Sequence, residues 1–418
     1  MRRTWGFLPL AGLAVFVLLG MGSAVADPAT PYVPDQVLVK FRPGTPASEI
    51  ARAHASAHAA IRDEIPQIGV QIVGLPRGLS VGKAIGFYER NPNVEFVEPD
   101  YYIEPSLRPN DEWYANWQLS LQWMGSEAAW DITTGSSSVP IAILDSGADF
   151  EHPDLQGRLL SGWDFVDGDG DPMDEHGHGT AVTGVAGATT NNLFGIAGVT
   201  WENPVLVVRI GDWTGASTWG RMAQGITYAA DQGARAINIS YAGTSYTSSG
   251  ASAVAYAWSR GAVTVSSAGN SNTDTPHYPA ALPNVIGVSG TDGWDELISY
   301  SNYGIWVDVC APAGSRTTSL GGNIGNVGGT SISAPYVTGL FGLVFSANPS
   351  LTPQQAVDIV CQTATDLGDP GFDEYYGWGK IDLHRAVLAA AEAGGGGGGG
   401  DEDTTAPLVS IASPAPDA

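Results

Sequence analysis

The feature that most constrains the fold is a set of five short apolar segments, rich in β-branched residues, that recur between residues 139 and 290. They read "VPIAILDSG" (139–147), "PVLVVRIG" (204–211), "ARAINIS" (234–240), "AVTVSSAGN" (262–270) and "NVIGVSG" (284–290). Alanine-rich helical stretches lie between them at 180–188, 219–233 and 251–261. Strands that are apolar on both faces and joined by helical crossovers are typical of a buried parallel sheet. The pattern predicts an α/β domain over residues 110–393, whose functional residues gather beyond the carboxyl ends of the strands.

A smaller α+β unit is expected before this domain. Its strands are predicted at 36–41, 70–75 and 94–101, and its helices at 47–60 and 81–90. The proline-rich segment "EPSLRPND" (104–111) then reads as a hinge.

The two ends of the chain carry signals of their own. Residues 1–26 combine Arg2 and Arg3, a short apolar run and "AVA", the pattern of an export signal peptide. The alternative, a membrane anchor, needs a run of about 20 apolar residues, and this run is shorter. Residues 394–403 are expected to form a glycine-rich acidic linker, and residues 404–418 to begin a truncated immunoglobulin-like repeat.

The net charge of −25 is concentrated in the later part of the chain. Residues 110–418 hold 8 basic and 33 acidic side chains, whereas residues 1–109 hold 10 of each. Such a surface disfavours nucleic acid and anionic membranes as partners and favours cation binding. Of the two cysteines, Cys310 and Cys361, neither has a catalytic context, and export would permit either a disulfide or two buried thiols.

Three polar residues follow predicted strands or precede predicted helices. Asp145 ends a strand in "AILDSG", His178 precedes a Gly/Ala-rich helix in "GHGTAVTGVAGA", and Ser331 precedes an apolar helix in "GGTSISAPYV". Alone, the aspartate would be satisfied by backbone amides and the serine would be a helix cap. Together they supply the nucleophile, base and orienting acid that serine hydrolysis needs. Asn270 in "SSAGNSN" could donate to a developing oxyanion.

These motifs in the order Asp, His, Ser resemble the subtilisin family of serine peptidases, most nearly its thermitase-like branch. The resemblance spans residues 110–392 and implies a three-layer parallel-sheet peptidase domain. Residues 27–109 resemble the inhibitory propeptide of the family, with a ferredoxin-like fold. By resemblance, Asp145 orients the base His178, Ser331 is the nucleophile and Asn270 lines the oxyanion hole. His176 falls on a variable position and is expected to be a solvated neighbour.

Some positions depart from the family pattern. The segment that pairs with substrate reads Ser240-Tyr241-Ala242, where the family usually has Ser-Leu-Gly. The resemblance implies substrate binding by these three residues and by Gly269, and Ala242 could narrow the primary specificity pocket. The serine motif continues Ile332-Ser333 rather than Met-Ala, and Ala181 replaces a usual histidine.

An acidic loop, "WDFVDGDGDPMDE" (163–175), predicts a calcium site. Alternating carboxylates and glycines suit a hard cation that takes six to eight oxygen ligands, and the alternative is a solvated loop. The resemblance supports Asp164, Asp167, Asp169 and Asp171 as ligands. It also implies a second calcium site formed by Asp111, Asp154, Asn192 and the carbonyls of Thr189, Phe194 and Ile196.

The sequence therefore predicts a secreted, monomeric, calcium-stabilised serine endopeptidase that is made as a self-processing precursor and needs no organic cofactor. Its partners are protein or peptide substrates and its own propeptide. One alternative is a catalytically silent, calcium-stabilised surface module. Another is a metal-dependent hydrolase that uses His176 and His178 as an H-x-H ligand pair.

Overall fold

The computed structural model describes residues 32–102 and 107–395. The chain divides into two compact units between Pro105 and Ser106. The predicted signal peptide, most of the glycine linker and the C-terminal tail lie outside the described residues.

The first unit is a four-stranded antiparallel sheet with two helices. Its elements are β1 (Tyr32–Phe41), α1 (Ala47–Ser56), β2 (Ala60–Ile65), β3 (Val70–Gly74), α2 (Val81–Tyr88) and β4 (Val94–Tyr101), and the strand order is β2-β3-β1-β4. The α+β prediction is confirmed, but the sequence prediction missed β2 and ran α1 four residues too far. Every residue of β2 is exposed, so its sequence "AIRDEI" lacks the alternation that identifies a half-buried strand.

The second unit is built on a seven-stranded parallel sheet of order β11-β10-β9-β8-β5-β7-β6. The five predicted strands are β5 (Ile141–Asp145), β7 (Val205–Arg209), β8 (Ala236–Ile239), β9 (Val263–Ser267) and β10 (Val285–Thr291). The two strands that the sequence prediction missed are β6 (Leu159–Asp164) and β11 (Val309–Pro312), which occupy the edges. The sequence of β6, LLSGWD, contains polar residues and is partly exposed, and that of β11, VCAP, ends in proline, so neither carries the continuous β-branched run of a central strand.

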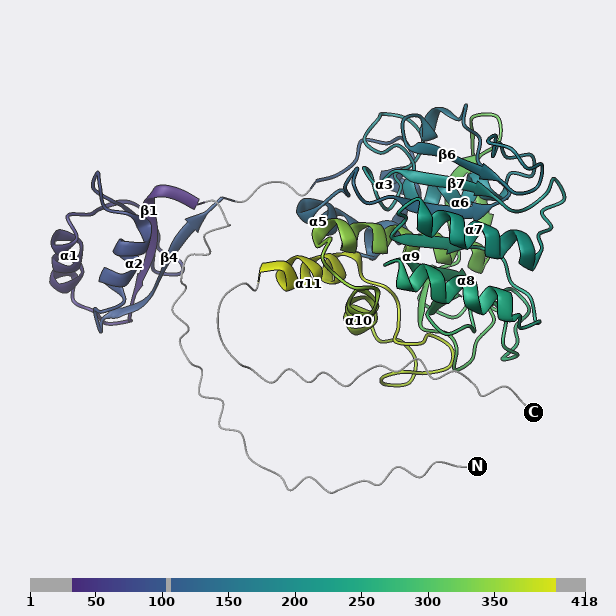
Figure 1. Ribbon diagram of the computed structural model, residues 1–418. Coiled ribbons are helices and arrows are strands. Elements are labelled where there is room, and N and C mark those ends of the chain that lie inside the picture. The colour runs from purple at the N-terminus through teal and green to yellow at the C-terminus, as the bar shows by residue number, and fades with distance from the viewer. Residues whose placement is uncertain (1–31, 103–106, 396–418) are drawn as a thin grey trace, which may run out of the picture. The chain divides into compact units, whose positions relative to one another are not determined.

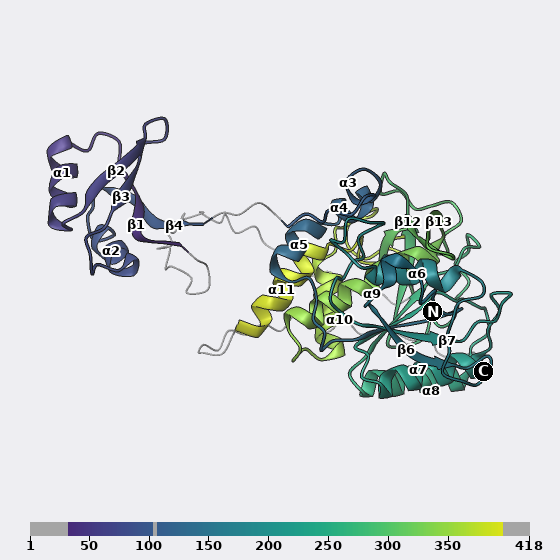
Figure 2. The same cartoon turned by 90° about the horizontal axis from the view of Figure 1, so that it is seen from above.

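Helices cover both faces of this sheet, which gives the three layers that the sequence predicted. Figure 2 shows α7 (Trp219–Asp231) and α8 (Ser248–Ser259) on one side, and α6 (His178–Gly187) and α9 (Thr330–Ala347) on the other. Each side has its own apolar core, one packed under α7 and α8 and one around α9. The strand order changes direction at β5, and open parallel sheets bind their ligands at such switch points.

The remaining elements frame this core (Figure 1). They are α3 (Tyr114–Trp117), α4 (Leu119–Trp123), α5 (Ser126–Ile132), the 3-10 turn η1 (Pro153–Leu155), the antiparallel hairpin β12 (Gly314–Ser319) and β13 (Asn323–Gly328), α10 (Pro353–Thr363) and α11 (Leu383–Gly395). The last helix therefore extends two residues into the glycine run.

Cys310 and Cys361 are buried free thiols, and burial raises the pKa of both.

The helix α9 is the central core element of the domain. It is long and apolar enough to cross a bilayer, but 83% of its 18 residues are buried inside the domain. Its length and hydropathy are those of a helix surrounded by protein, because it contacts both the sheet and the neighbouring helices.

We expect truncation of α9 in this core to be costly. Leu343→Ala removes a fully buried side chain and should lower the free energy of unfolding by about 2–5 kcal/mol. Leu388→Ala in α11, at a residue that is 40% exposed, is the matched control and should cost under about 1 kcal/mol. Equilibrium urea unfolding of both variants measures the difference, and equal costs would contradict this account of the core.

Candidate active site

The strand β5 ends on Asp145, in the middle of the sheet between β8 and β7. The carboxylate is fully buried, and its Oδ1 accepts the backbone N–H of Ser146 at 2.8 Å. Asp145 Oδ2 is buried and has no hydrogen-bond partner among the described residues. A buried carboxylate is stable only when donors offset its lost hydration, so Asp145 needs a further donor besides the Ser146 N–H.

His178 supplies that donor from the first residue of α6. Its Nδ1 lies 2.7 Å from Asp145 Oδ1, and its side chain is 31% exposed. This contact requires α6 to begin directly against the end of β5. Gly179 permits it, because a Cβ at this position would lie 2.1 Å from the carbonyl oxygen of Gly147.

The Asp145 carboxylate controls the titration of His178. Its negative charge raises the pKa of His178 above 6.5, burial opposes this, and the hydrogen bond to Asp145 adds to the rise. The pair therefore stabilises the fold fully below pH 6.5, and this contribution is lost as the pH rises through the higher pKa of the folded state.

Ser331 lies in the first turn of α9, after Gly329, whose φ of 124° only glycine adopts readily. Pro335 lies four residues further along the helix and has no N–H to donate to the carbonyl of Ser331. The hydroxyl of Ser240 donates to that carbonyl instead, at 2.9 Å. A proline inside the helix thus ties the serine to the end of β8.

Asn270 follows β9 and is held by the same helix start. Its Oδ1 accepts the N–H and the hydroxyl of Thr330, at 2.9 and 3.0 Å. This arrangement fixes the plane of the amide and leaves Nδ2 as a donor at the wall of the cleft.

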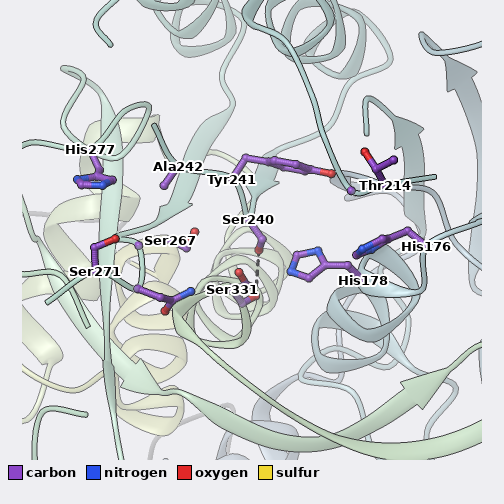
Figure 3. Close-up of a pocket in the computed structure, with 13 residues that line it drawn as sticks. His176, His178, Thr214, Ser240, Tyr241, Ala242, Ser267, Ser271, His277 and Ser331 are labelled. Carbon is purple, nitrogen blue, oxygen red and sulfur yellow. Dashed lines mark hydrogen bonds between the residues drawn. The ribbon is translucent and has the colours of Figure 1, made fainter. Parts of the chain in front are cut away.

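His178, Ser331 and Asn270 meet in a cleft of about 340 Å³, and the buried Asp145 is linked to it through His178. Figure 3 shows the His178 ring pointing toward Ser331, with His176 on its other side. Because His178 Nδ1 is bonded to Asp145 and its free edge faces Ser331, the two histidines do not converge on one point. The arrangement gives no support to an H-x-H metal pair. The lining residues are His176, His178, Thr214, Gly215, Ser240, Tyr241, Ala242, Ser267, Gly269, Asn270, Ser271, His277 and Ser331.

All four residues that the sequence assigned to substrate binding line this cleft. Tyr241 packs its ring edge-on to His178, with ring centroids 6.3 Å apart. Ala242 lies between Tyr241 and His277 along the wall (Figure 3). The sequence analysis missed His277, whose Nδ1 lies 2.8 Å from the carbonyl oxygen of Thr275, because it follows neither a strand nor a motif.

In the acidic loop, carboxylates form ion pairs with an arginine side chain of the same domain. The Arg209 guanidinium, at the end of β7, contacts Asp164 at 2.8 Å, Asp167 at 2.9 Å and the neighbouring Glu175 at 2.6 Å. The premise that these like charges need a bound metal ion therefore does not hold for Asp164 and Asp167. Asp169 Oδ1 accepts the N–H of Asp171 at 3.0 Å, so the far end of the loop is an internal turn.

At the second predicted calcium site the carboxylates have no positively charged side chain beside them among the described residues. Asp111 and Asp154 are buried, and neither forms an ion pair with a Lys or Arg of the described residues. Burial raises the pKa of Asp154 to about 7 against the hydrogen bonds from Ile196 and Asn192, and the nearby Asp111 adds to the rise. Asp111 Oδ1 is buried and has no hydrogen-bond partner there.

This pair fits a hard cation. The described residues contain no group of three or more His, Cys, Asp or Glu side chains able to hold a metal ion, so a cation here would need amide and carbonyl oxygens as well. The loop 189–196 lies against the pair, since the N–H groups of Thr189 and Ile196 both bond to Asp154 at 2.7 Å. Asn192 turns its amide nitrogen toward Asp154 Oδ1, and Phe194 donates its N–H to Asn192 Oδ1. Asn192 would therefore have to turn its amide over to become a ligand.

The Asp145–His178 pair leads to a direct prediction. The imidazole of His178 should titrate with a pKa above 6.5, and Asp145→Asn should lower that value because it removes the dominant charge. NMR titration of the histidine signals in a Ser331→Ala background measures both. A pKa below 6.5, or the same value in both proteins, would contradict the geometry.

Comparison with known proteins follows the same two-unit division. Residues 136–379 match the subtilase family, peptidase S8, and residues 21–100 match the fervidolysin N-terminal prodomain. The chain is 39% identical to a thermophilic serine proteinase of Bacillus sp. (strain AK1) over 85% of this chain and 88% of the relative. It is 41% identical to thermitase of Thermoactinomyces vulgaris over 67% of this chain and 99% of the relative.

A solved structure of a protease from Pseudoalteromonas arctica PAMC 21717 superposes with a TM-score of 0.61 at 29% identity, covering 68% of this chain and 99% of that one. With the parallel sheet and the cleft described above, these matches confirm the subtilisin-like fold and the predicted enzyme class. The chain belongs to the subtilase family of serine endopeptidases and carries a fervidolysin-like prodomain before its peptidase domain.

Proposed function

We propose that this chain hydrolyses peptide bonds with Asp145, His178 and Ser331 as its catalytic triad and Asn270 as an oxyanion donor. The observation that carries the proposal is the 2.7 Å contact between His178 and Asp145 in a cleft that also contains Ser331 and Asn270. Nucleophile, base, orienting acid and oxyanion donor are the four groups that acyl transfer from a serine requires.

The contacts of Asp145, His178 and Asn270 suit the separate steps of peptide hydrolysis. Asp145 accepts Nδ1–H, which leaves Nε2 of His178 as the lone pair that removes the Ser331 proton during attack on the substrate carbonyl. The fixed Nδ2 of Asn270 donates to the oxyanion as negative charge develops. His178 then protonates the leaving amine, and water hydrolyses the acyl-enzyme by the reverse sequence.

The first unit is proposed to act as an intramolecular inhibitor of an exported precursor. Its sheet has one face against α1 and α2, while Leu38, Ile72 and Phe96 remain at least partly exposed on the other. An exposed apolar face of this kind favours binding to a protein partner. The peptidase domain of the same chain is the partner present at the highest effective concentration. Cleavage within residues 100–110 would then release the mature enzyme. Export rests on the signal-peptide pattern of residues 1–26.

Calcium is proposed at Asp111 and Asp154, with carbonyls of Thr189, Phe194 and Ile196 and the turned amide of Asn192 completing the oxygen ligands. The support is the buried, unpaired Asp111 oxygen and the mutual repulsion of the two carboxylates. A bound cation would give the buried Asp111 oxygen a partner and offset the repulsion between the two carboxylates. It would also hold the segment after residue 107 against the loop 189–196. The proposal is not extended to the acidic loop, where Arg209 provides the positive charge.

Ser331→Ala tests the catalytic proposal. Peptide hydrolysis should fall by about 10⁶-fold, because the groups of a triad act as a unit. The variant should also remain at precursor mass, since it cannot cut its own junction. Purified wild-type and variant proteins, folded with calcium, are compared by hydrolysis rate and intact mass.

Two outcomes would point elsewhere. Equal activity in both proteins would contradict the serine mechanism and revive the metal-hydrolase alternative. Two folded but inactive proteins would favour the silent surface module. Thr214→Ala, at the rim of the same cleft, controls for nonspecific effects of substitution there.

Asp154→Asn tests the calcium proposal by stability rather than activity. In a Ser331→Ala background, calcium at 100 times its dissociation constant should add about 2.7 kcal/mol to the free energy of unfolding, and Asp154→Asn should abolish most of this gain. Asp171→Asn is the control and should retain it. Thermal unfolding with and without calcium gives the comparison, and equal gains in all three proteins would refute this site.

A further inference from the structure

Asp174 is a buried carboxylate for which the mechanism above has no use. It is 5% exposed and lies four residues before His178. Within the described chain it forms no ion pair with Lys or Arg, unlike the neighbouring Glu175. A buried charge without a counter-ion needs several hydrogen bonds. Here those hydrogen bonds connect Asp174 to the two elements that carry the proposed catalytic pair.

One set of these hydrogen bonds holds the start of α6. Asp174 Oδ2 accepts the N–H and the hydroxyl of Thr180 at 2.8 and 2.6 Å. Oδ1 accepts the N–H groups of His176 and Gly177 at 2.9 and 2.8 Å. A carboxylate in this place satisfies amides at the helix start and interacts favourably with the helix dipole.

The other set reaches the end of β5 through Ser146. The Ser146 hydroxyl donates to Asp174 Oδ1 at 2.8 Å and accepts the N–H of Gly179 at 2.9 Å. The N–H of Ser146 donates to Asp145 Oδ1, the oxygen that also bonds His178. One carboxylate thus links both partners of the Asp145–His178 pair through a single serine.

We propose that Asp174 is a positioning residue for the catalytic base: it locks the start of α6 to the end of β5, and its fixed negative charge favours the imidazolium that His178 becomes during catalysis. The inference rests on the proposed role of His178 as base. It gives a role to Asp174, which the sequence analysis did not assign to calcium or to catalysis.

The electrostatics of the surroundings agree with this role. Burial alone would raise the pKa of Asp174, but the hydrogen bonds from Thr180, Gly177 and His176 outweigh it and hold the pKa below 3.8. Asp174 is therefore ionised wherever His178 titrates. Among the described titratable groups, Asp145 from β5 contacts the His178 ring, His176 and Tyr241 each lie 6.3 Å from it between ring centroids, and Asp174 acts on it from the loop through its charge. Of these charges, Asp174 follows Asp145 in raising the pKa of His178.

Asp174→Asn keeps the size of the side chain and removes its charge. We expect kcat to fall about 10- to 100-fold, the range for loss of a hydrogen bond to a charged group. The acid limb of the pH profile of kcat/KM should move to lower pH, because the imidazolium loses a stabilising charge. Glu175→Gln removes the same charge one residue away, from a carboxylate that is more than half exposed and pairs with Arg209, and should leave both quantities unchanged.

A second variant separates the link from the charge. Ser146→Ala removes the hydroxyl bridge but keeps Asp174 and its hydrogen bonds to α6. It should lower kcat with a smaller movement of the acid limb than Asp174→Asn produces. It also keeps the proposal testable if Asp174→Asn does not fold.

NMR titration of His178 in a Ser331→Ala, Asp174→Asn double variant reads the charge effect without any enzyme activity. A lower His178 pKa than in Ser331→Ala alone supports the proposal even if the hydrolysis proposal fails. An unchanged His178 pKa, or a fall in kcat with an unmoved acid limb, would overturn it and leave Asp174 with a purely structural role.

Discussion

The structure depends on how closely the first turn of α6 approaches the end of β5. That approach brings a helix start carrying His178 onto a buried strand end carrying Asp145, and it is possible only because Gly179 has no side chain to strike the backbone of Gly147. The carboxylate is then buried by the same packing that brings its partner. Burial makes the unsatisfied acid costly and the imidazole contact valuable, so the site and the core stabilise each other.

The nucleophile side of the cleft is held by a different device. Pro335 removes one hydrogen bond from α9, and Ser240 at the end of β8 supplies the replacement to the carbonyl of Ser331. Thr330 meanwhile fixes the amide of Asn270. The serine and the oxyanion donor are therefore positioned by α9, and the base by α6. The parallel sheet brings the two helix starts together because its strand ends share one edge.

Much of this could be predicted from the sequence, for physical reasons. Central strands such as β5 and β7 are apolar on both faces, and the motifs around Asp145, His178 and Ser331 follow directly from their strand ends or helix starts. The edge strands β6 and β11 and the exposed β2 lack that signal. The acidic loop is the least predictable part, because carboxylate spacing does not reveal that Arg209, more than forty residues away in sequence, pairs with Asp164 and Asp167. Nor does it reveal that Asp174 faces inward. His277 lines the cleft from an irregular loop, and the periodicity of apolar residues predicts helices and strands but not the course of such a loop.

The most direct measurement of the central claim is labelling of the folded, mature protein with a serine-directed fluorophosphonate, followed by peptide mapping. The account predicts one modified residue, Ser331, and loss of labelling in His178→Ala whose junction has been cut by a separate, removable protease, because the serine is nucleophilic only while the imidazole removes its proton. Label on another residue, or equal labelling rates in wild type and His178→Ala, would contradict it.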